Sequence, residues 1–262
     1  MAMALAGAIA QSEPDVTFIA SDVSEQQRKR FSENVAAALP AGEETADRIV
    51  TTGDNARVTA EADLVFLAVK PQVLDTVYPD IAQTEVLVVS IAAGVRIASI
   101  EQALPRARVI RVMPNTPGLI GEMAAGYAGG SRATEEDTKL VGRLLSAAGT
   151  AMHVPEEQLD AVTGVAGSGP AFVARLIEAF TDAGVAHGLS HEQAYELVLA
   201  TFRGTAGLLK QKEMSPQELI DTVSSPNGTT VAGRSVLESS DIQNVIRSTV
   251  DTTVSRAKEL GS

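Results

Sequence analysis

The chain has no cysteine and no tryptophan among its 262 residues. Without cysteine it can form neither disulfides nor thiolate metal sites, so we expect a reducing or indifferent compartment, most simply the cytoplasm. No apolar run approaches the roughly 18 residues of a membrane-spanning helix. The apolar stretch 1–11 also lacks the basic start of a signal peptide.

Basic residues are scarce, with 21 Lys and Arg against 33 Asp and Glu, which gives a net charge of −12. A nucleic-acid partner needs clustered Lys and Arg for its phosphates, and an anionic membrane attracts the same residues. The sequence therefore predicts neither partner. Hydrophobic residues make up 45% of the chain, enough for a buried core in one large or two modest domains.

Histidines are also few: His153, His187 and His191. The last two are four residues apart, but Gly188 and a predicted helix cap at Ser190 break the helix between them. That spacing does not give a helical metal pair, and we expect no metal site.

Apolar runs alternate with helical patterns over the first 115 residues. The run 63–69 is apolar throughout, as in a strand buried on both faces, and Ser24 with Gln27 marks a helix start. This alternation predicts a parallel sheet with crossover helices. The predicted strands are 16–20, 47–52, 63–69, 85–94 and 108–114, and the predicted helices 24–39, 71–81 and 97–104.

Only helical patterns follow residue 155. We therefore predict an α/β class fold: a Rossmann-like domain over 1–155, then an all-helical domain over 156–262. The helical half is short and rich in amphipathic segments, so we expect it to complete its core by pairing with a second copy. Its predicted helices are 169–184, 190–210, 215–223, 229–239 and 242–260.

One piece of a Rossmann fold is missing from the sequence. Such a fold opens with a strand, a G-x-G-x-x-G loop and a helix, and residues 1–11 already have the pattern of that helix. Met1 would stand at the end of the loop. We expect the natural chain to begin with a strand and glycine turn ahead of Met1.

The predicted strands end in small or polar residues, over 19–22, 68–72, 90–94 and 112–118. Each end alone is ordinary turn chemistry, but four aligned carboxyl ends of a parallel sheet favour a cofactor site. Asp22 follows a strand, where acidic residues commonly bind ribose hydroxyls; a solvated turn is the alternative. Asn55 begins a short helix, where its alternative role is an N-cap.

The segment SSPNGTT, 224–230, places many small donors between two predicted helices. The start of the second helix offers unpaired N–H groups and a partial positive charge, which suit a small carboxylate. A serine or threonine cap without a ligand is the alternative.

Glycines 164, 167 and 169 follow the spacing G-x-x-G-x-G. In hydroxyacid dehydrogenases of the hydroxyisobutyrate type, a catalytic Lys and Asn follow this pattern. Here those places hold Val173 and Leu176, so a base for alcohol oxidation is absent.

Five segments in order resemble the pyrroline-5-carboxylate reductase family: DLVFLAVKPQV, SIAAGVRIASIEQAL, RVMPNTPGLIGEM, DAVTGVAGSGPAF and SSPNGTTVAG. The resemblance covers essentially the whole chain after its first residue. It implies an oxidoreductase that reduces a cyclic imine to L-proline with NADPH or NADH. It also implies a Rossmann-like domain and a helical domain that interlocks with a partner in a homodimer, which in some members assembles into a decamer.

The resemblance and the strand ends together assign a site. Asn55 matches a residue near the adenosine end of the cofactor, and Asn115 one behind the nicotinamide. Thr230 matches the threonine beside the ring nitrogen and is the predicted catalytic residue; Glu156 matches an acidic residue close to the site. The predicted cofactor residues are Met1, Ser21, Asp22, Asn55, Ala68, Val69, Lys70, Pro71, Ala92, Ala93 and Asn115, and the predicted substrate residues are Ser225, Asn227, Gly228, Thr229, Thr230 and Glu156.

Two departures from the family pattern leave questions open. The family has Gly-Gly where this chain has Asn227-Gly228, and because asparagine tolerates the left-handed conformation, we expect the turn to survive. Asp22 disfavours a 2′-phosphate, which leaves the choice between NADPH and NADH open. The alternative functions are a related reductase of another imine or keto acid, and a non-catalytic dimeric relative without the cofactor loop.

Overall fold

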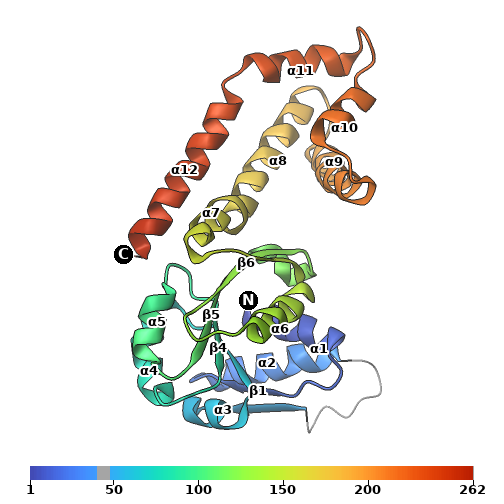
Figure 1. Ribbon diagram of the computed structural model, residues 1–262. Coiled ribbons are helices and arrows are strands. Elements are labelled where there is room, and N and C mark those ends of the chain that lie inside the picture. The colour runs from blue at the N-terminus through green and yellow to red at the C-terminus, as the bar shows by residue number, and fades with distance from the viewer. Residues whose placement is uncertain (40–47, 262) are drawn as a thin grey trace. The chain divides into compact units, whose positions relative to one another are not determined.

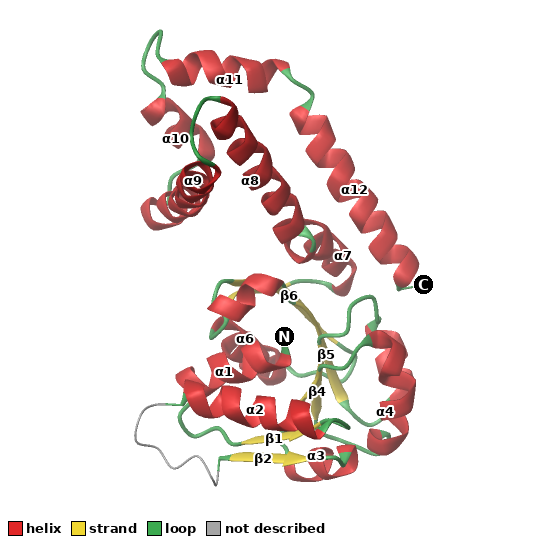
Figure 2. Ribbon diagram, turned by 180° about the vertical axis from the view of Figure 1, so that it is seen from behind, coloured by secondary structure: helices red, strands yellow, loops and turns green. Residues whose placement is uncertain are grey.

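The computed structural model describes residues 1–39 and 48–261, which divide into two compact units (Figures 1 and 2). The first unit is Met1–Ser168 together with the chain from Thr253 on, and the second is Gly169–Thr252. The predicted domain boundary after residue 155 lies before this division and stays a prediction.

The first unit alternates strands and helices, as the sequence predicts (Figure 1). Its elements up to the fifth strand are α1 (Ala2–Ser12), β1 (Phe18–Ser21), α2 (Glu25–Ala38), β2 (Ile49–Thr52), α3 (Asn55–Glu61), β3 (Leu64–Leu67), the 3₁₀ turn η1 (Pro71–Val73), α4 (Leu74–Ile81), β4 (Leu87–Ser90), α5 (Ile97–Ala103) and β5 (Arg108–Met113). They continue as η2 (Thr116–Ile120), β6 (Met123–Gly129), α6 (Glu135–Ser146), β7 (Gly149–His153), η3 (Glu156–Gln158), α7 (Leu159–Val162) and the π-helical turn η4 (Thr163–Gly167).

The strands of this unit form two sheets. β1 and β2 pair in parallel, and a second sheet has the order β3-β4-β5-β6-β7. β3, β4 and β5 are parallel as predicted, whereas β6 runs antiparallel to β5. Strands β6 and β7 and helix α6 were not predicted. Within the described residues β1 and β3 share no ladder, so the sheet is interrupted between them.

The strand β4 forms the centre of the core. All four of its residues are buried, and Val88 and Val89 lie in different apolar clusters because successive side chains point to opposite faces. β3 is less covered than its apolar sequence predicts. Leu64 and Phe66 are only partly buried, because β3 pairs with a neighbour on one side alone.

Helix α1 packs against residues of both sheets. Leu5 belongs to the cluster that contains Val89 of β4, whereas Ala6 and Ala10 pack in a cluster that Phe18 of β1 adjoins. One helix therefore covers both sides of the interruption. The interruption falls where the sequence predicts an absent strand, and that absent strand stays a prediction.

The second unit consists of helices, with the predicted order and nearly the predicted bounds. They are α8 (Gly169–Ala186), α9 (His191–Lys212), α10 (Pro216–Val223), α11 (Thr229–Ser239) and α12 (Ile242–Leu260), the last of which ends in the first unit. Ser190 and Gln193 form the predicted capping box of α9. No helix among the described residues is long and apolar enough to cross a membrane.

The second unit buries very little of its own surface. Within Gly169–Thr252, all of which the structure describes, only Thr181 and Ala194 are buried, although Phe180 and Phe202 make an edge contact between α8 and α9. Large apolar side chains stay exposed on every helix, including Val173, Phe180, Leu197, Val223, Val236, Leu237 and Val245. An exposed apolar surface of this extent indicates association with another molecule.

The end of α12 returns to the first unit. A Cβ atom placed on Gly94, whose φ is +77°, would lie 3.3 Å from the Cβ of Leu260. The backbone after β4 therefore approaches α12 closely enough to favour glycine, for which the left-handed conformation also carries no steric penalty.

Candidate functional site

The carboxyl ends of β3, β4 and β5 lie side by side in the first unit. The register pairs Leu67 with Ser90 and Ser90 with Arg111, and the N–H of Ile91 donates to the carbonyl of Leu67 at 3.1 Å. The loops that follow these strands therefore leave the sheet at one edge, which we call the cofactor edge. Open parallel sheets bind ligands at such an edge.

Small side chains line the cofactor edge. Ala68 and Ala93 are exposed, whereas Ala92 is buried and its N–H donates to Ser90 Oγ at 3.3 Å. Lys70 is exposed, and Val69 and Pro71 are partly buried. With no bulky side chain on Ala68 or Ala93, a ligand can approach the backbone closely at both loops.

Met1 places the start of α1 near this edge. Met1 packs against the cluster that Phe66 and Ile91 also contact, and it precedes α1 without a side-chain cap. An uncapped helix start directs backbone N–H groups outward and favours a phosphate. The small edge and this helix start together fit a dinucleotide.

Ser21, Asn55 and Asp80 form a hydrogen-bonded chain beside the ends of β1 and β2. Ser21 Oγ donates to Asn55 Oδ1 at 2.8 Å, and Asn55 Nδ2 donates to Asp80 Oδ2 at 2.9 Å. The structure therefore brings two predicted cofactor residues, Ser21 and Asn55, together, and Asp80 holds the amide of Asn55 in one orientation.

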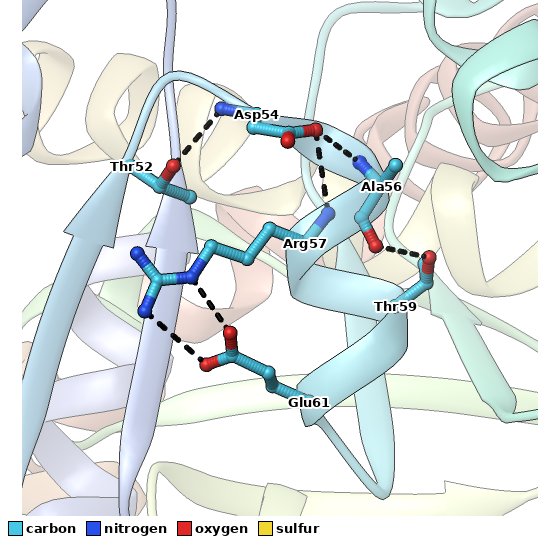
Figure 3. Close-up of polar contacts among 6 residues, drawn as sticks. All are labelled: Thr52, Asp54, Ala56, Arg57, Thr59 and Glu61. Carbon is cyan, nitrogen blue, oxygen red and sulfur yellow. Dashed lines mark hydrogen bonds and ion pairs between the residues drawn. The ribbon is translucent and has the colours of Figure 1, made fainter.

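The turn from β2 into α3 leaves the side chain of Asn55 available for these hydrogen bonds. Asp54, rather than Asn55, caps α3 (Figure 3): its Oδ1 accepts from the N–H groups of Ala56 and Arg57 at 2.9 and 3.3 Å. The N–H of Asp54 in turn donates to Thr52 Oγ1 at 3.1 Å. The alternative of an Asn55 cap is therefore wrong.

Asp22 and Arg28 lie together after β1. Asp22 Oδ1 accepts from the N–H of Ser24 at 2.8 Å, and the Arg28 guanidinium donates to the carbonyl of Asp22 at 2.7 Å. The sequence analysis did not identify Arg28. A basic residue in the first turn of the helix after a strand was the signal that could have found it.

Asn115 is buried at the end of β5, and both ends of its amide are bonded internally. Its Oδ1 accepts from the N–H of Ala124 at 2.9 Å, and its Nδ2 donates to the carbonyl of Ala166 at 3.1 Å. The amide thus fixes the loop after β5 to β6 and to the η4 turn. The predicted contact behind a nicotinamide stays a prediction.

Glu156 joins a network of charged groups. Its Oε1 lies 3.0 Å from the guanidinium of Arg111, a residue buried in β5, and accepts from the N–H of Ile97 at 2.8 Å. Nearby, Arg96 pairs with buried Asp160 at 2.7 Å. These contacts give Glu156 a role in holding the start of α5, while its predicted contact with substrate stays a prediction.

The loop between α10 and α11 forms a tight turn in the second unit. The N–H of Gly228 donates to the carbonyl of Ser225 at 2.9 Å, and Asn227 has the left-handed φ of 59° that we expected. A Cβ on Gly228 would lie 2.9 Å from the carbonyl oxygen of Ser225, so the backbone at this position favours glycine. The turn therefore survives with asparagine in place of the first glycine.

Helix α11 begins at Thr229 with an open N-terminus. Gly228 is its N-cap and provides no side-chain cap. Thr229 and Thr230 are exposed, and neither hydroxyl has a hydrogen-bond partner among the residues that the structure describes. This helix start therefore has no serine or threonine cap, and that alternative interpretation of the segment is wrong.

Helix α10 gives the loop a fixed beginning. Ser215 and Glu218 form a capping box, and the backbone N–H and then the hydroxyl of Ser215 lower the pKa of Glu218. At the other end, Arg234 reaches Ser224 Oγ at 3.5 Å. The predicted substrate loop belongs to the second unit and the predicted cofactor residues to the first, and each set is organised within its own unit.

Two family models match the chain. One, for pyrroline-5-carboxylate reductase dimerisation, covers residues 156–260, and the other, for NADP oxidoreductase, coenzyme F420-dependent, covers residues 1–94. Among curated relatives, a pyrroline-5-carboxylate reductase of Methanosarcina acetivorans is 44% identical over 79% of this chain and 78% of its own. One of Pseudomonas aeruginosa is 38% identical over 99% of this chain and 93% of its own.

Solved structures give the same match. A pyrroline-5-carboxylate reductase from Coxiella burnetii superposes with a TM-score of 0.89 at 30% identity, and covers 100% of this chain and 94% of its own. A pyrroline carboxylate reductase from Plasmodium falciparum, solved with NADP bound, has a TM-score of 0.77 at 27% identity, over 99% of this chain and 94% of its own.

Proposed function

Because the chain belongs to the pyrroline-5-carboxylate reductase family, we propose that it reduces 1-pyrroline-5-carboxylate to L-proline, the last step of proline biosynthesis, with NADPH or NADH. The observation that carries this proposal within the chain is the open start of α11, where two unpaired threonine hydroxyls stand beside unpaired backbone N–H groups. That group of donors suits one carboxylate and one ring nitrogen.

The substrate carboxylate binds at the start of α11. The first N–H groups of a helix have no partner within it, and the helix dipole places a partial positive charge there. The turn at Ser225–Gly228 keeps the approach open, since Gly228 has no side chain and Asn227 bends the backbone away. Ser225 and Thr229 add hydroxyls on either side.

Thr230 binds the ring nitrogen. Its hydroxyl accepts from the protonated imine and can donate to the amine lone pair that forms as the carbon is reduced. The bound nicotinamide supplies the hydride. The remaining task of the chain is to hold two rings face to face, and positioning of this kind lowers barriers by up to about 7–11 kcal/mol.

The cofactor edge positions the hydride donor. The small residues Ala68, Ala92 and Ala93 admit a dinucleotide against the strand ends, and the start of α1 suits its pyrophosphate. Asn115 fixes the loop that lies behind the nicotinamide in this proposal. No side-chain base is needed, in agreement with the absence of a Lys and Asn at Val173 and Leu176.

Replacing Thr230 with valine is expected to lower turnover by roughly 5- to 150-fold, because one hydrogen bond to the reacting nitrogen, worth about 1–3 kcal/mol, is lost. Oxidation of NADPH with pyrroline-5-carboxylate measures this. Ser235→Ala is the matched control, because the Ser235 hydroxyl bonds only to the carbonyl of Ala232 in its own helix. Equal rates for folded Thr230→Val and wild-type protein would overturn the assignment.

The chain associates with further copies through its second unit, which matches the family's dimerisation model. We propose a homodimer formed by residues after 156, with assembly into a decamer as the further step, and a cytoplasmic location in line with the absence of cysteine. The support is the small buried core of Gly169–Thr252.

Light scattering on the full chain at micromolar concentration is expected to give at least twice the 27.3 kDa mass of one chain. Replacing the exposed Val236 and Leu237 with serine is expected to weaken the association, since buried apolar area drives it. A monomer in the wild-type sample would contradict the proposal.

A further inference from the structure

Arg28 occupies a fixed place at the end of β1. It lies in the first turn of α2, where its Nη1 donates to the carbonyls of Asp22 and Val23 at 2.7 and 3.4 Å. A Cβ on Gly53, in the turn after β2, would lie 3.8 Å from the same nitrogen. The guanidinium therefore stands where the carboxyl ends of two parallel strands meet.

This guanidinium retains donors for a ligand. Arginine has five N–H donors, and both hydrogen bonds that Arg28 makes within the described residues use Nη1. Arg28 forms no ion pair with any residue in the described ranges, although it is partly buried. A cation held in place by carbonyls, without an acidic partner, is prepared for an anion that arrives from outside the chain.

The acidic side chain of Asp22, whose carbonyl holds Arg28, is turned onto the backbone. Asp22 Oδ1 accepts from the N–H of Ser24, the N-cap of α2. In dinucleotide folds an acidic residue at this place binds the ribose 2′-hydroxyl, and a nearby arginine accommodates a 2′-phosphate. This chain has both groups, so the position of each decides which cofactor is favoured.

We propose that Arg28 binds the 2′-phosphate of the cofactor and makes NADPH the preferred hydride donor, with Asp22 reducing that preference. The proposal rests on the proposed function for the identity of the cofactor. The guanidinium is anchored by Asp22 and Val23 and therefore loses little freedom on binding. The neighbouring hydrogen bond between Ser21 and Asn55, two predicted cofactor residues, places the ribose of the cofactor at the same end of β1.

Titration calorimetry with two nucleotides that represent the adenosine half of the cofactor tests the role of Arg28 without any turnover. The probe is 2′,5′-ADP, which carries the 2′-phosphate, and the reference is 5′-ADP, which lacks it. Arg28→Gln is expected to weaken 2′,5′-ADP binding by about 10- to 150-fold and to leave 5′-ADP binding nearly unchanged. Arg28→Lys, which keeps the charge and loses the planar fork, is expected to fall between.

Lys29→Gln is the matched control, because Lys29 is the next residue, is 77% exposed and pairs only loosely with Glu33 at 3.9 Å. It is expected to change 2′,5′-ADP binding by less than about threefold. Asp22→Asn is expected to strengthen 2′,5′-ADP binding, because a like charge leaves the corner.

Three results would overturn the proposal: a wild-type chain that does not prefer 2′,5′-ADP to 5′-ADP, an Arg28→Gln variant that loses both equally, or a Lys29→Gln variant that loses as much. The proposed function fails on a different result. If the chain binds 2′,5′-ADP through Arg28 but does not reduce pyrroline-5-carboxylate, the role of Arg28 is supported and the proposed function is wrong.

Discussion

Replacing Glu156 with leucine is expected to lower the free energy of unfolding of the first unit by about 3–5 kcal/mol, because Arg111 would stay buried with an unpaired charge. Arg111 lies in β5 with a side chain that is only 3% exposed. The N–H of Ile97 would lose its acceptor as well, at the start of α5. Urea denaturation followed by circular dichroism measures the loss.

The double variant Arg111→Met/Glu156→Leu distinguishes two causes of the stability loss, an unpaired buried charge and a simple loss of packing. Removing both charges is expected to restore much of the stability, since apolar residues of similar size often replace buried ion pairs without loss. The exposed pair of Glu135 and Lys139 is the control, and Glu135→Leu should cost less than about 0.5 kcal/mol. A loss for Glu156→Leu as small as that of the control would contradict the buried-pair account.

Replacing Asn115 with leucine is the second large effect we expect. The N–H of Ala124 and the carbonyl of Ala166, both only partly exposed, would lose their partner, at about 1–3 kcal/mol each, for a total of about 2–6 kcal/mol. Leucine keeps the branching of asparagine at Cγ but is the larger side chain, and it has no hydrogen-bonding group. Denaturant titration gives the stability, and NADPH binding by calorimetry reports on the loop after β5.

Asn244→Leu is the control for this prediction. The Asn244 side chain is exposed and bonds only to Asp241 at 2.6 Å, so its loss should stay within about 0.5 kcal/mol. If Asn115→Leu kept the wild-type stability, the two backbone groups would have other partners, and the account of this loop would be wrong.

The sequence predicted the helical half well because local signals delimit it. Ser190 and Ser215 cap α9 and α10 by bonds to residues three positions on, which the sequence alone displays. β6 escaped prediction for the opposite reason. Met123–Gly129 is a run of Ala and Gly with little apolar alternation, and it is held as a strand by pairing with β5 and β7.

The candidate site was predictable to the extent that its residues form local motifs. The left-handed turn at Asn227 follows from its own sequence, whereas Glu156 meets Arg111 and Ile97 across 45 and 59 residues. Arg28 is different, because its bonds to the carbonyls of Asp22 and Val23 span only six and five residues, and a basic residue in the first helical turn after a strand is a local signal. Contacts made at long range leave no signal in a short stretch of sequence.

The return of α12 to the first unit sets an order of events during synthesis. Domains generally fold as the chain emerges, N-terminal part first, so residues 1–168 leave the ribosome before the second unit exists. Leu260, which lies against Gly94, is made after the whole of the second unit. The loop that follows β4 therefore gains its contact with α12 only once Gly169–Thr252 has been synthesised.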